Sequence, residues 1–164
     1  MTVCQICTPE WLEASANSYR SDPRFAKAFE KLTLKICFKF KAEKAWGIEK
    51  DIIYGAFVDK GQLMRLSFFS EEDAKRQADF ILAATPQEWK KILRKESKFV
   101  TDFMLGKIGL EQGSKAGVLG VAPYAGTFVD ALTQTPLQFP DEMSPDELTQ
   151  YRSHMEEFRA RLGV

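Results

Sequence analysis

The sequence contains few residues of the kinds that carry out catalysis or hold metal ions. Its 164 residues include one histidine and three cysteines, and its 23 basic and 23 acidic side chains leave no net charge. A neutral chain has no overall electrostatic attraction for nucleic acid, so we expect no nucleic-acid partner. Because no apolar run reaches the ~18 residues of a spanning helix, we also expect no membrane span.

Signals for secretion and for disulfide bonds are also missing. The sequence does not begin with a basic stretch followed by an apolar one, as a secretory leader does. Three cysteines are an odd number, which does not suit a disulfide framework and fits a reducing compartment. We therefore expect a cytoplasmic protein whose contact with membranes is at most a transient surface contact.

The short motifs that could carry chemistry are incomplete. Cys4 and Cys7 form a C-x-x-C pair, but a structural zinc site needs four ligands, and only Cys37 and His154 remain for it on distant elements. A zinc ion that bridges two copies is the remaining alternative. The glycine-rich segment 109–115 has the wrong spacing for a phosphate-binding loop. We expect no metal, no cofactor and no catalytic residue.

The charges are unevenly distributed along the chain. Lysines are frequent between residues 27 and 50, whereas Asp and Glu gather between residues 141 and 157. Two interpretations stay open. The two regions are either solvated faces that attract each other weakly, or the lysines form a basic surface that meets an anionic membrane or the phosphates of coenzyme A.

Hydrophobic periodicity predicts strands in the first half of the chain and helices around them. In residues 34–41 apolar side chains alternate with lysines and Cys37, which indicates a half-buried strand. The predicted strands are residues 34–41, 52–58, 62–69, 78–84 and 107–112, and helices are predicted to begin at Pro9, Pro23, Pro86, Ser97, Ser114, Ala125 and Pro145. This order predicts an α+β fold with a five-stranded, mostly antiparallel sheet that helices cover on one face.

A capping box marks the start of the last predicted helix. Ser144 and Glu147 can cap each other's backbone, and Pro145 suits the first helical position. One face of this helix carries an apolar stripe, which must be buried against the domain, a partner or a second copy. The stripe consists of Leu148, Tyr151, Met155, Phe158 and Leu162.

Apolar side chains are abundant in the predicted sheet and helices. They are more numerous than one layer of sheet and helix needs, and two interpretations fit: a plain packed core, or a cavity. Gly117, Gly120 and Gly126 leave room for a ligand or for close approach of helices. Asp79 is the notable polar residue, either bonding a backbone N–H at a strand edge or anchoring a ligand at the mouth of a pocket.

Three short motifs stand out in the second half of the chain: Ala78-Asp79-Phe80-Ile81-Leu82, Trp89-Lys90-Lys91-Ile92-Leu93 and Gly106-Lys107-Ile108-Gly109-Leu110. They resemble the sterol carrier protein (SCP-2-like) domain family, and the strand and hairpin before them also fit it. The resemblance implies a five-stranded antiparallel sheet, helices over one face and an apolar tunnel between them. On this basis we divide the chain into an N-terminal helical segment, 1–22, an SCP-2-like lipid-binding domain, 23–134, and a linker with a C-terminal amphipathic helix, 135–164.

The resemblance implies non-catalytic binding and transfer of a fatty acid, fatty acyl-CoA, sterol or similar lipid. Burying about sixteen chain carbons releases on the order of 10 kcal/mol, so binding needs no specific polar contact. The alternative is an accessory or interaction module of an acyl-CoA- or lipid-metabolising enzyme, with an enzyme partner or a second copy docked on the C-terminal helix. The expected lipid-binding residues are Phe38, Leu66, Phe68, Phe80, Leu82, Trp89, Leu93, Phe103 and Phe128.

Overall fold

A five-stranded sheet forms the centre of the computed structural model, which describes residues 2–164. The strand order is β4-β3-β2-β5-β6, with β2 and β5 parallel and the other neighbours antiparallel. The predicted α+β fold with a mostly antiparallel sheet is therefore confirmed. The strands are β2 (Thr33–Phe40), β3 (Ile52–Asp59), β4 (Gln62–Phe69), β5 (Phe80–Ala84) and β6 (Gly109–Gln112).

The hairpin between β3 and β4 shows how local sequence shapes the sheet. Asp59 pairs with Gln62, so the loop has two residues, Lys60 and Gly61, and both have positive φ angles of 47° and 83°. Such a turn matches the twist of the flanking strands. A side chain at Gly61 would also meet the backbone oxygen of Ala26 at 2.3 Å, so glycine is required there.

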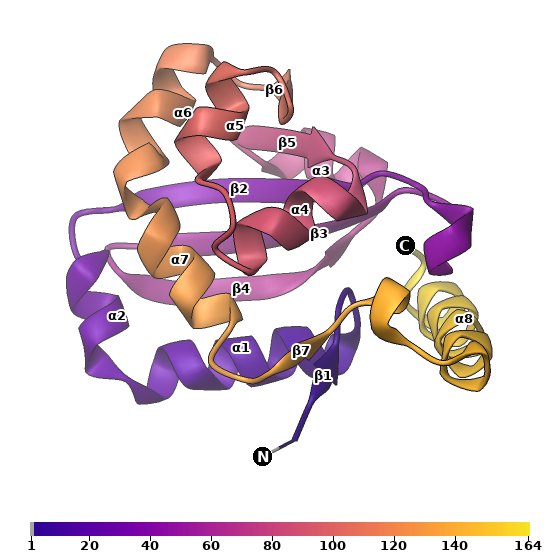
Figure 1. Cartoon of the computed structure of the whole chain (residues 1–164). Coiled ribbons are helices and arrows are strands. Elements are labelled where there is room, and N and C mark those ends of the chain that lie inside the picture. The colour runs from indigo at the N-terminus through magenta and orange to yellow at the C-terminus, as the bar shows by residue number, and fades with distance from the viewer. Residues whose placement is uncertain (1) are drawn as a thin grey trace.

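Helices cover one face of the sheet (Figure 1). Several start as the sequence predicts, with a Ser or Thr side chain capping the first turn and, in α1 and α4, a proline at the first helical position. A further helix, α3 (Glu71–Gln77), packs on the opposite face. The covering helices are α1 (Pro9–Ser21), α2 (Pro23–Ala28), α4 (Pro86–Leu93), α5 (Phe99–Met104), α6 (Lys115–Val121) and α7 (Ala125–Leu132), with a 3₁₀ turn at Ala122–Tyr124.

The N-terminal segment and the segment before the last helix pair with each other beside the sheet. Strand β1 (Cys4–Gln5) pairs in parallel with β7 (Leu137–Gln138), so the predicted linker contains a strand and also a 3₁₀ turn, Pro140–Glu142. Helix α8 (Pro145–Leu162) lies at one side of the molecule, near the 3₁₀ turn Lys44–Trp46 (Figure 1). All three segments of the predicted domain division thus contribute to one core.

The apolar stripe of α8 is largely buried within its own chain. Tyr151, Met155 and Phe158 are at most 3% exposed, whereas Leu162 is 46% exposed. The ring of Phe158 stacks on that of Phe68 in β4, and the Tyr151 hydroxyl donates a hydrogen bond to the carbonyl of Ile6. Because the domain itself covers this stripe, its central residues are not free to dock an enzyme or a second copy.

The opposite face of the sheet holds a buried lysine. The Nζ of Lys39 lies 2.9 Å from a carboxylate oxygen of Glu71 in α3 and 2.6 Å from one of Glu111 in β6. Its side chain is 5% exposed, so the two carboxylates compensate the cost of burying its charge. These ion pairs connect α3 and the edge strand β6 to β2 on the outer face of the sheet.

Candidate ligand-binding site

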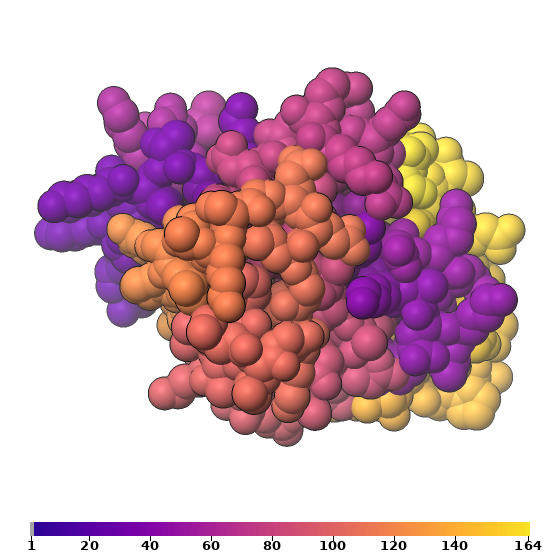
Figure 2. Space-filling view, turned by 90° about the horizontal axis from the view of Figure 1, so that it is seen from above, coloured from indigo at the N-terminus to yellow at the C-terminus, as the bar shows by residue number. Residues whose placement is uncertain are grey.

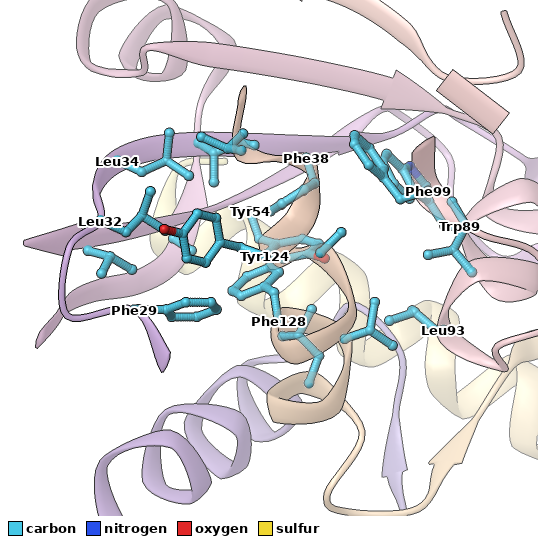
Figure 3. A pocket seen from close by; sticks show the side chains of 18 residues that line it. Phe29, Leu32, Leu34, Phe38, Tyr54, Trp89, Leu93, Phe99, Tyr124 and Phe128 are labelled. Atoms are coloured by element: carbon cyan, nitrogen blue, oxygen red, sulfur yellow. The ribbon is translucent and has the colours of Figure 1, made fainter. Parts of the chain in front are cut away.

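An apolar cavity lies between the inner face of the sheet and the covering helices (Figure 3). Its volume is about 80 Å³. The lining residues come from the turn after α2, from β2 and β3, and from the helices and the 3₁₀ turn between α4 and the end of α7. They are Phe29, Leu32, Leu34, Ile36, Phe38, Tyr54, Ala56, Val58, Trp89, Ile92, Leu93, Phe99, Val121, Tyr124, Ala125, Phe128, Val129 and Leu132.

The sheet side of the cavity follows from strand alternation. Every second residue of a strand points to the same face, and three inner-facing residues of β2 and three of β3 line the cavity. Ala56 is the smallest of them and leaves space between the larger side chains. All the sheet residues on the wall are buried, so this side of the cavity is firmly packed.

Aromatic contacts fix the helix side of the cavity. The indole N–H of Trp89 in α4 donates a 2.8 Å hydrogen bond to the backbone carbonyl of Lys39, and its ring meets that of Phe38 edge-on at 5.8 Å. The ring of Phe128 in α7 stacks on Phe38 at 5.4 Å. Phe38 is therefore held between two helices.

The structure brings some of the expected lipid-binding residues together on the cavity wall. Phe38, Trp89, Leu93 and Phe128 line it. These residues come from a strand and two helices that are far apart in the sequence, so the fold itself creates this part of the wall.

The other expected residues lie elsewhere in or beside the core. Phe68 is covered by Phe158, and Phe103 stacks with Phe99 at 5.9 Å. Leu82 is fully buried, and Leu66 is partly buried against the core clusters. The ring of Phe80 lies against the backbone of Gly113 and Gly117, where a Cβ atom would approach within 2.7 Å of it. None of these side chains borders the cavity in the described structure.

Several wall residues are not among those expected from the sequence. Phe29 directly follows α2, and Tyr54 occupies an inner-facing position of β3. Both carry a sequence signal for burial, and neither carries one that separates a cavity wall from a packed core. Tyr124 lies in the 3₁₀ turn between α6 and α7, where no periodic pattern marks it.

The cavity wall offers almost no acid–base chemistry. Among the described residues that line it, none is a carboxylic acid, histidine, lysine or arginine. Tyr54 is the buried titratable group, and burial, followed by the nearby Cys7, raises its pKa well above the ordinary value. The cavity can hold an apolar molecule, and at neutral pH it presents no charged group to one.

A shallow groove lies outside the cavity, between α5 and α7. It has a volume of about 520 Å³, and the cavity and the groove share Ile92, Phe99, Ala125 and Val129 in their walls. A side-chain layer thus separates the two spaces. An ion pair between Lys95 and Asp130, with 2.6 Å between Nζ and the carboxylate, lies at the groove.

The helix segment from α6 to α7 forms the thin side of the cavity. Figure 2 shows this segment, in orange, at the molecular surface. Its wall residues Val121, Ala125 and Phe128 are only partly buried, unlike the wall residues of the sheet. Helix α7 also lacks a side-chain cap at its start. The segment therefore differs from the sheet side of the wall in its partial burial and in the uncapped start of α7.

The other candidate groups do not form a second site. Asp79 accepts a 3.0 Å hydrogen bond from the backbone N–H of Lys35. This is the first of its two expected roles, in which the carboxylate bonds a backbone N–H and does not anchor a ligand. His154 pairs with Glu10 at the surface. Cys4, Cys7 and Cys37 are free and buried, and within residues 2–164 no group of three or more His, Cys, Asp or Glu side chains could hold a metal ion.

Two lysines of the basic stretch point away from the cavity. Lys35 and Lys39 alternate with the inner-facing residues of β2 and so point to the outer face of the sheet. Lys39 is already paired with two carboxylates.

Similar folds occur among solved structures, although no protein-family model and no curated protein sequence matches the chain. A conserved hypothetical protein of Thermus thermophilus, suggested to be a sterol carrier protein, has a TM-score of 0.71 and 16% identity, over 84% of this chain and 94% of that one. A crystal structure of sterol carrier protein 2 has a TM-score of 0.69 and 17% identity, over 79% and 98%. The apo form of sterol carrier protein 2 from Yarrowia lipolytica has a TM-score of 0.53 and 12% identity, over 76% and 90%.

These comparisons establish the class of fold. The chain has the SCP-2-like fold, which confirms the resemblance seen in the three sequence motifs. It spans nearly the whole length of each of the three matched chains. No helix within residues 2–164 combines the length and the hydrophobicity needed to cross a lipid bilayer.

Proposed function

We propose that the protein binds and transfers a hydrophobic ligand, such as a fatty acid, a sterol or a similar lipid, without catalysing a reaction on it. The observation that carries this proposal is the cavity between sheet and helices, whose wall is built from apolar and aromatic side chains. The likeness of the fold to sterol carrier protein 2 supports it. An apolar wall with no charged group suits a ligand that is held by burial of its surface.

The cavity must expand to hold a lipid. Its volume of about 80 Å³ lies well below the ~300–1,000 Å³ of typical ligand sites. The sheet wall is closely packed, so the space comes from outward movement of α6 and α7, the partly buried wall. Burial of a long acyl chain releases on the order of 10 kcal/mol of free energy. Ordering the ligand and separating the helices cost part of this, and a net gain of several kcal/mol remains.

Binding is tested with the purified full-length chain after lipid extraction. Trp89 lies on the wall, so a bound lipid changes the tryptophan fluorescence. We expect a saturable change with at least one class among fatty acids, fatty acyl-CoAs and sterols, and native mass spectrometry of unextracted protein identifies a co-purified ligand. If no class produces a saturable change and no ligand co-purifies, the proposal is wrong.

A matched pair of variants shows whether the ligand enters this cavity. Ala125 lines the cavity, whereas a side chain at Gly126, the next residue of α7, would meet nothing within 4 Å. Ala125→Leu fills the cavity and should lower lipid affinity about tenfold or more. Gly126→Leu adds the same side chain outside the cavity and should leave the affinity unchanged. Equal affinities in both variants would place the ligand elsewhere.

The alternative function, an interaction module that docks through α8, has little support in the contacts. The centre of its apolar stripe is buried against β4 and the N-terminal segment. The cytoplasm remains the compartment that we propose, because the three thiols are free.

A further inference from the structure

Helix α5 is apolar on two of its sides. Phe99 and Phe103 are four residues apart and share one side, where their rings stack at 5.9 Å and Phe103 is buried. Val100 and Met104 are also four residues apart, and they are 41% and 54% exposed. Because a helix with apolar residues all round is normally covered on every side, α5 leaves one apolar side without a cover.

The exposed side of α5 belongs to a larger apolar face. Val100 lines the same shallow groove as Ala122 and Pro123, which directly follow α6, and Figure 2 looks onto this side of the molecule. Four of the seven exposed large apolar side chains among the described residues lie on α5, on α6 or directly after α5, so they are concentrated and not scattered singly. We name these four residues the apolar face: Val100, Met104, Leu105 and Leu119.

The free charges near the apolar face are mostly positive. Residues 98–121 contain two acidic side chains, of which Asp102 is buried and Glu111 is paired with Lys39. Glu96, just before this stretch, is exposed. Against it stand three exposed lysines that form no ion pair with any residue from 2 to 164. They are Lys98, Lys107 and Lys115.

We infer that the apolar face docks on the surface of an anionic lipid bilayer, with its apolar side chains inserted among the headgroups and the three lysines next to the negative charges. Exposed apolar side chains beside free lysines are the combination that binds such a surface. A second copy of the chain fits less well, because a symmetric contact would bring the same three lysines of both copies together. The inference goes beyond the proposed function, since docking needs no ligand in the cavity.

Docking at this face would bring the bilayer to the helices that cover the cavity. Phe99 of α5 and Val121 of α6 line the cavity, whereas Val100 and Leu119 of the same helices belong to the apolar face. A single layer of helices thus lies between the two. The basic stretch between residues 27 and 50, for which an anionic membrane was one interpretation, is a different surface.

Co-sedimentation of the full-length protein with lipid vesicles tests the inference. We expect binding to vesicles of an equimolar mixture of phosphatidylcholine and phosphatidylserine, little binding to phosphatidylcholine alone, and weaker binding as salt is added. Combined replacement of the three lysines, Lys98→Gln, Lys107→Gln and Lys115→Gln, should lower the affinity for the anionic vesicles on the order of a hundredfold.

A matched triple variant controls for the loss of charge. Lys27→Gln, Lys31→Gln and Lys41→Gln remove the same charge from exposed lysines of the basic stretch and should change the affinity little. Equal losses in the two triple variants, or equal binding of the unaltered protein to neutral and anionic vesicles, would overturn the inference.

Two exposed methionines test the apolar part of the contact. Met104 belongs to the apolar face, whereas Met64 lies in β4 and is 61% exposed. Met104→Ser should weaken vesicle binding about threefold to tenfold, and Met64→Ser should leave it unchanged. Both side chains are largely in solvent, so both variants should keep a melting temperature close to that of the unaltered protein.

The outcomes separate this inference from the proposed function. The triple variant at Lys98, Lys107 and Lys115 should bind a fatty acid in solution as the unaltered protein does. Vesicle docking without any lipid uptake would overturn the proposed function alone. A dimer that Met104→Ser dissociates, in a protein that does not bind anionic vesicles, would make a second copy the occupant of the apolar face and overturn the inference.

Discussion

The ring of Phe128 in α7 stacks on the ring of Phe38 in β2, with 5.4 Å between the ring centroids and 20° between the ring planes. Phe38 is buried in the sheet, whereas Phe128 is only partly buried. The stack connects the firm wall of the cavity to the wall that we expect to move. It is the contact that must separate, or slide, when a long ligand enters.

Removal of the Phe128 ring should therefore enlarge the cavity at a cost in stability. For Phe128→Ala we expect the free energy of unfolding to fall by about 2–3 kcal/mol, toward the low end for a phenylalanine because the ring is partly exposed. Affinity for a long-chain lipid should be kept or increased, since the space is already open. Urea unfolding and tryptophan fluorescence titration measure the two effects.

Phe68→Ala is the matched control for this prediction. Phe68 also loses an aromatic stack, with Phe158, but it does not border the cavity. It should lower stability without a gain in lipid affinity. If the two variants changed lipid affinity alike, the Phe38–Phe128 stack would not be the closing contact.

Phe38 and Phe68 also show which features of the fold and the cavity could be predicted from the sequence. Both lie in predicted strands, and both pair with Tyr54 of β3, which places them on the same face of the sheet. What covers each of them depends on distant segments: α7 and α4 meet Phe38, whereas α8 meets Phe68. The strand pattern therefore predicts the sheet and its apolar face, but the position of the hollow depends on where the helices pack.

The same reasoning applies to Tyr54 and to Phe80. Tyr54 lies in a predicted strand, but its place on the cavity wall depends on where the distant helices pack. Phe80 lies in the motif that resembles the SCP-2-like family, yet Gly113 and Gly117 pack directly on its ring and leave no space there. Fold class was predictable from local patterns, and the wall of the site was predictable only in part.

The ion pair between Lys95 and Asp130 should affect the rate of ligand entry more than stability. Both side chains are exposed, at 63% and 48%, so the pair contributes at most about 1 kcal/mol. Asp130→Asn should leave the melting temperature nearly unchanged and speed lipid uptake in stopped-flow fluorescence. Added salt should speed uptake in the unaltered protein and much less in the variant. Equal salt effects on both proteins would show that the pair does not control entry.

The buried Lys39 should give the protein an acid-sensitive outer face. Its hydrogen bond and charge hold the pKa of Glu71 below its ordinary value. A carboxylate with a lowered folded-state pKa stabilises the fold above its unfolded-state pKa, and this contribution is lost as the pH falls through the folded-state value. The free energy of unfolding should therefore fall below about pH 4.5, the ordinary value for Glu71.

Lys39→Met tests this dependence against Lys75→Met. Lys75 is 63% exposed and lies 3.7 Å from the same Glu71 carboxylate. In Lys39→Met the pKa of Glu71 returns toward its ordinary value, so the free energy of unfolding should depend less on pH in the acid range. In Lys75→Met we expect the pH dependence of the unaltered protein. Urea unfolding across the acid range measures both profiles. Parallel profiles for Lys39→Met and the unaltered protein would contradict the assignment.

The last helix should behave as part of the core and not as an appendage. Phe158 lies on the buried face of α8, where its ring is fully enclosed and stacks on Phe68. Phe158→Ala should therefore lower the free energy of unfolding by about 3–5 kcal/mol. Leu162 belongs to the same stripe but is 46% exposed, and Leu162→Ala should cost less than about 1 kcal/mol. Urea unfolding of both variants at several protein concentrations measures the two losses of unfolding free energy. If α8 instead served as a docking surface for a second copy, the loss in Phe158→Ala would depend on protein concentration, whereas burial within one chain predicts the same loss at every concentration.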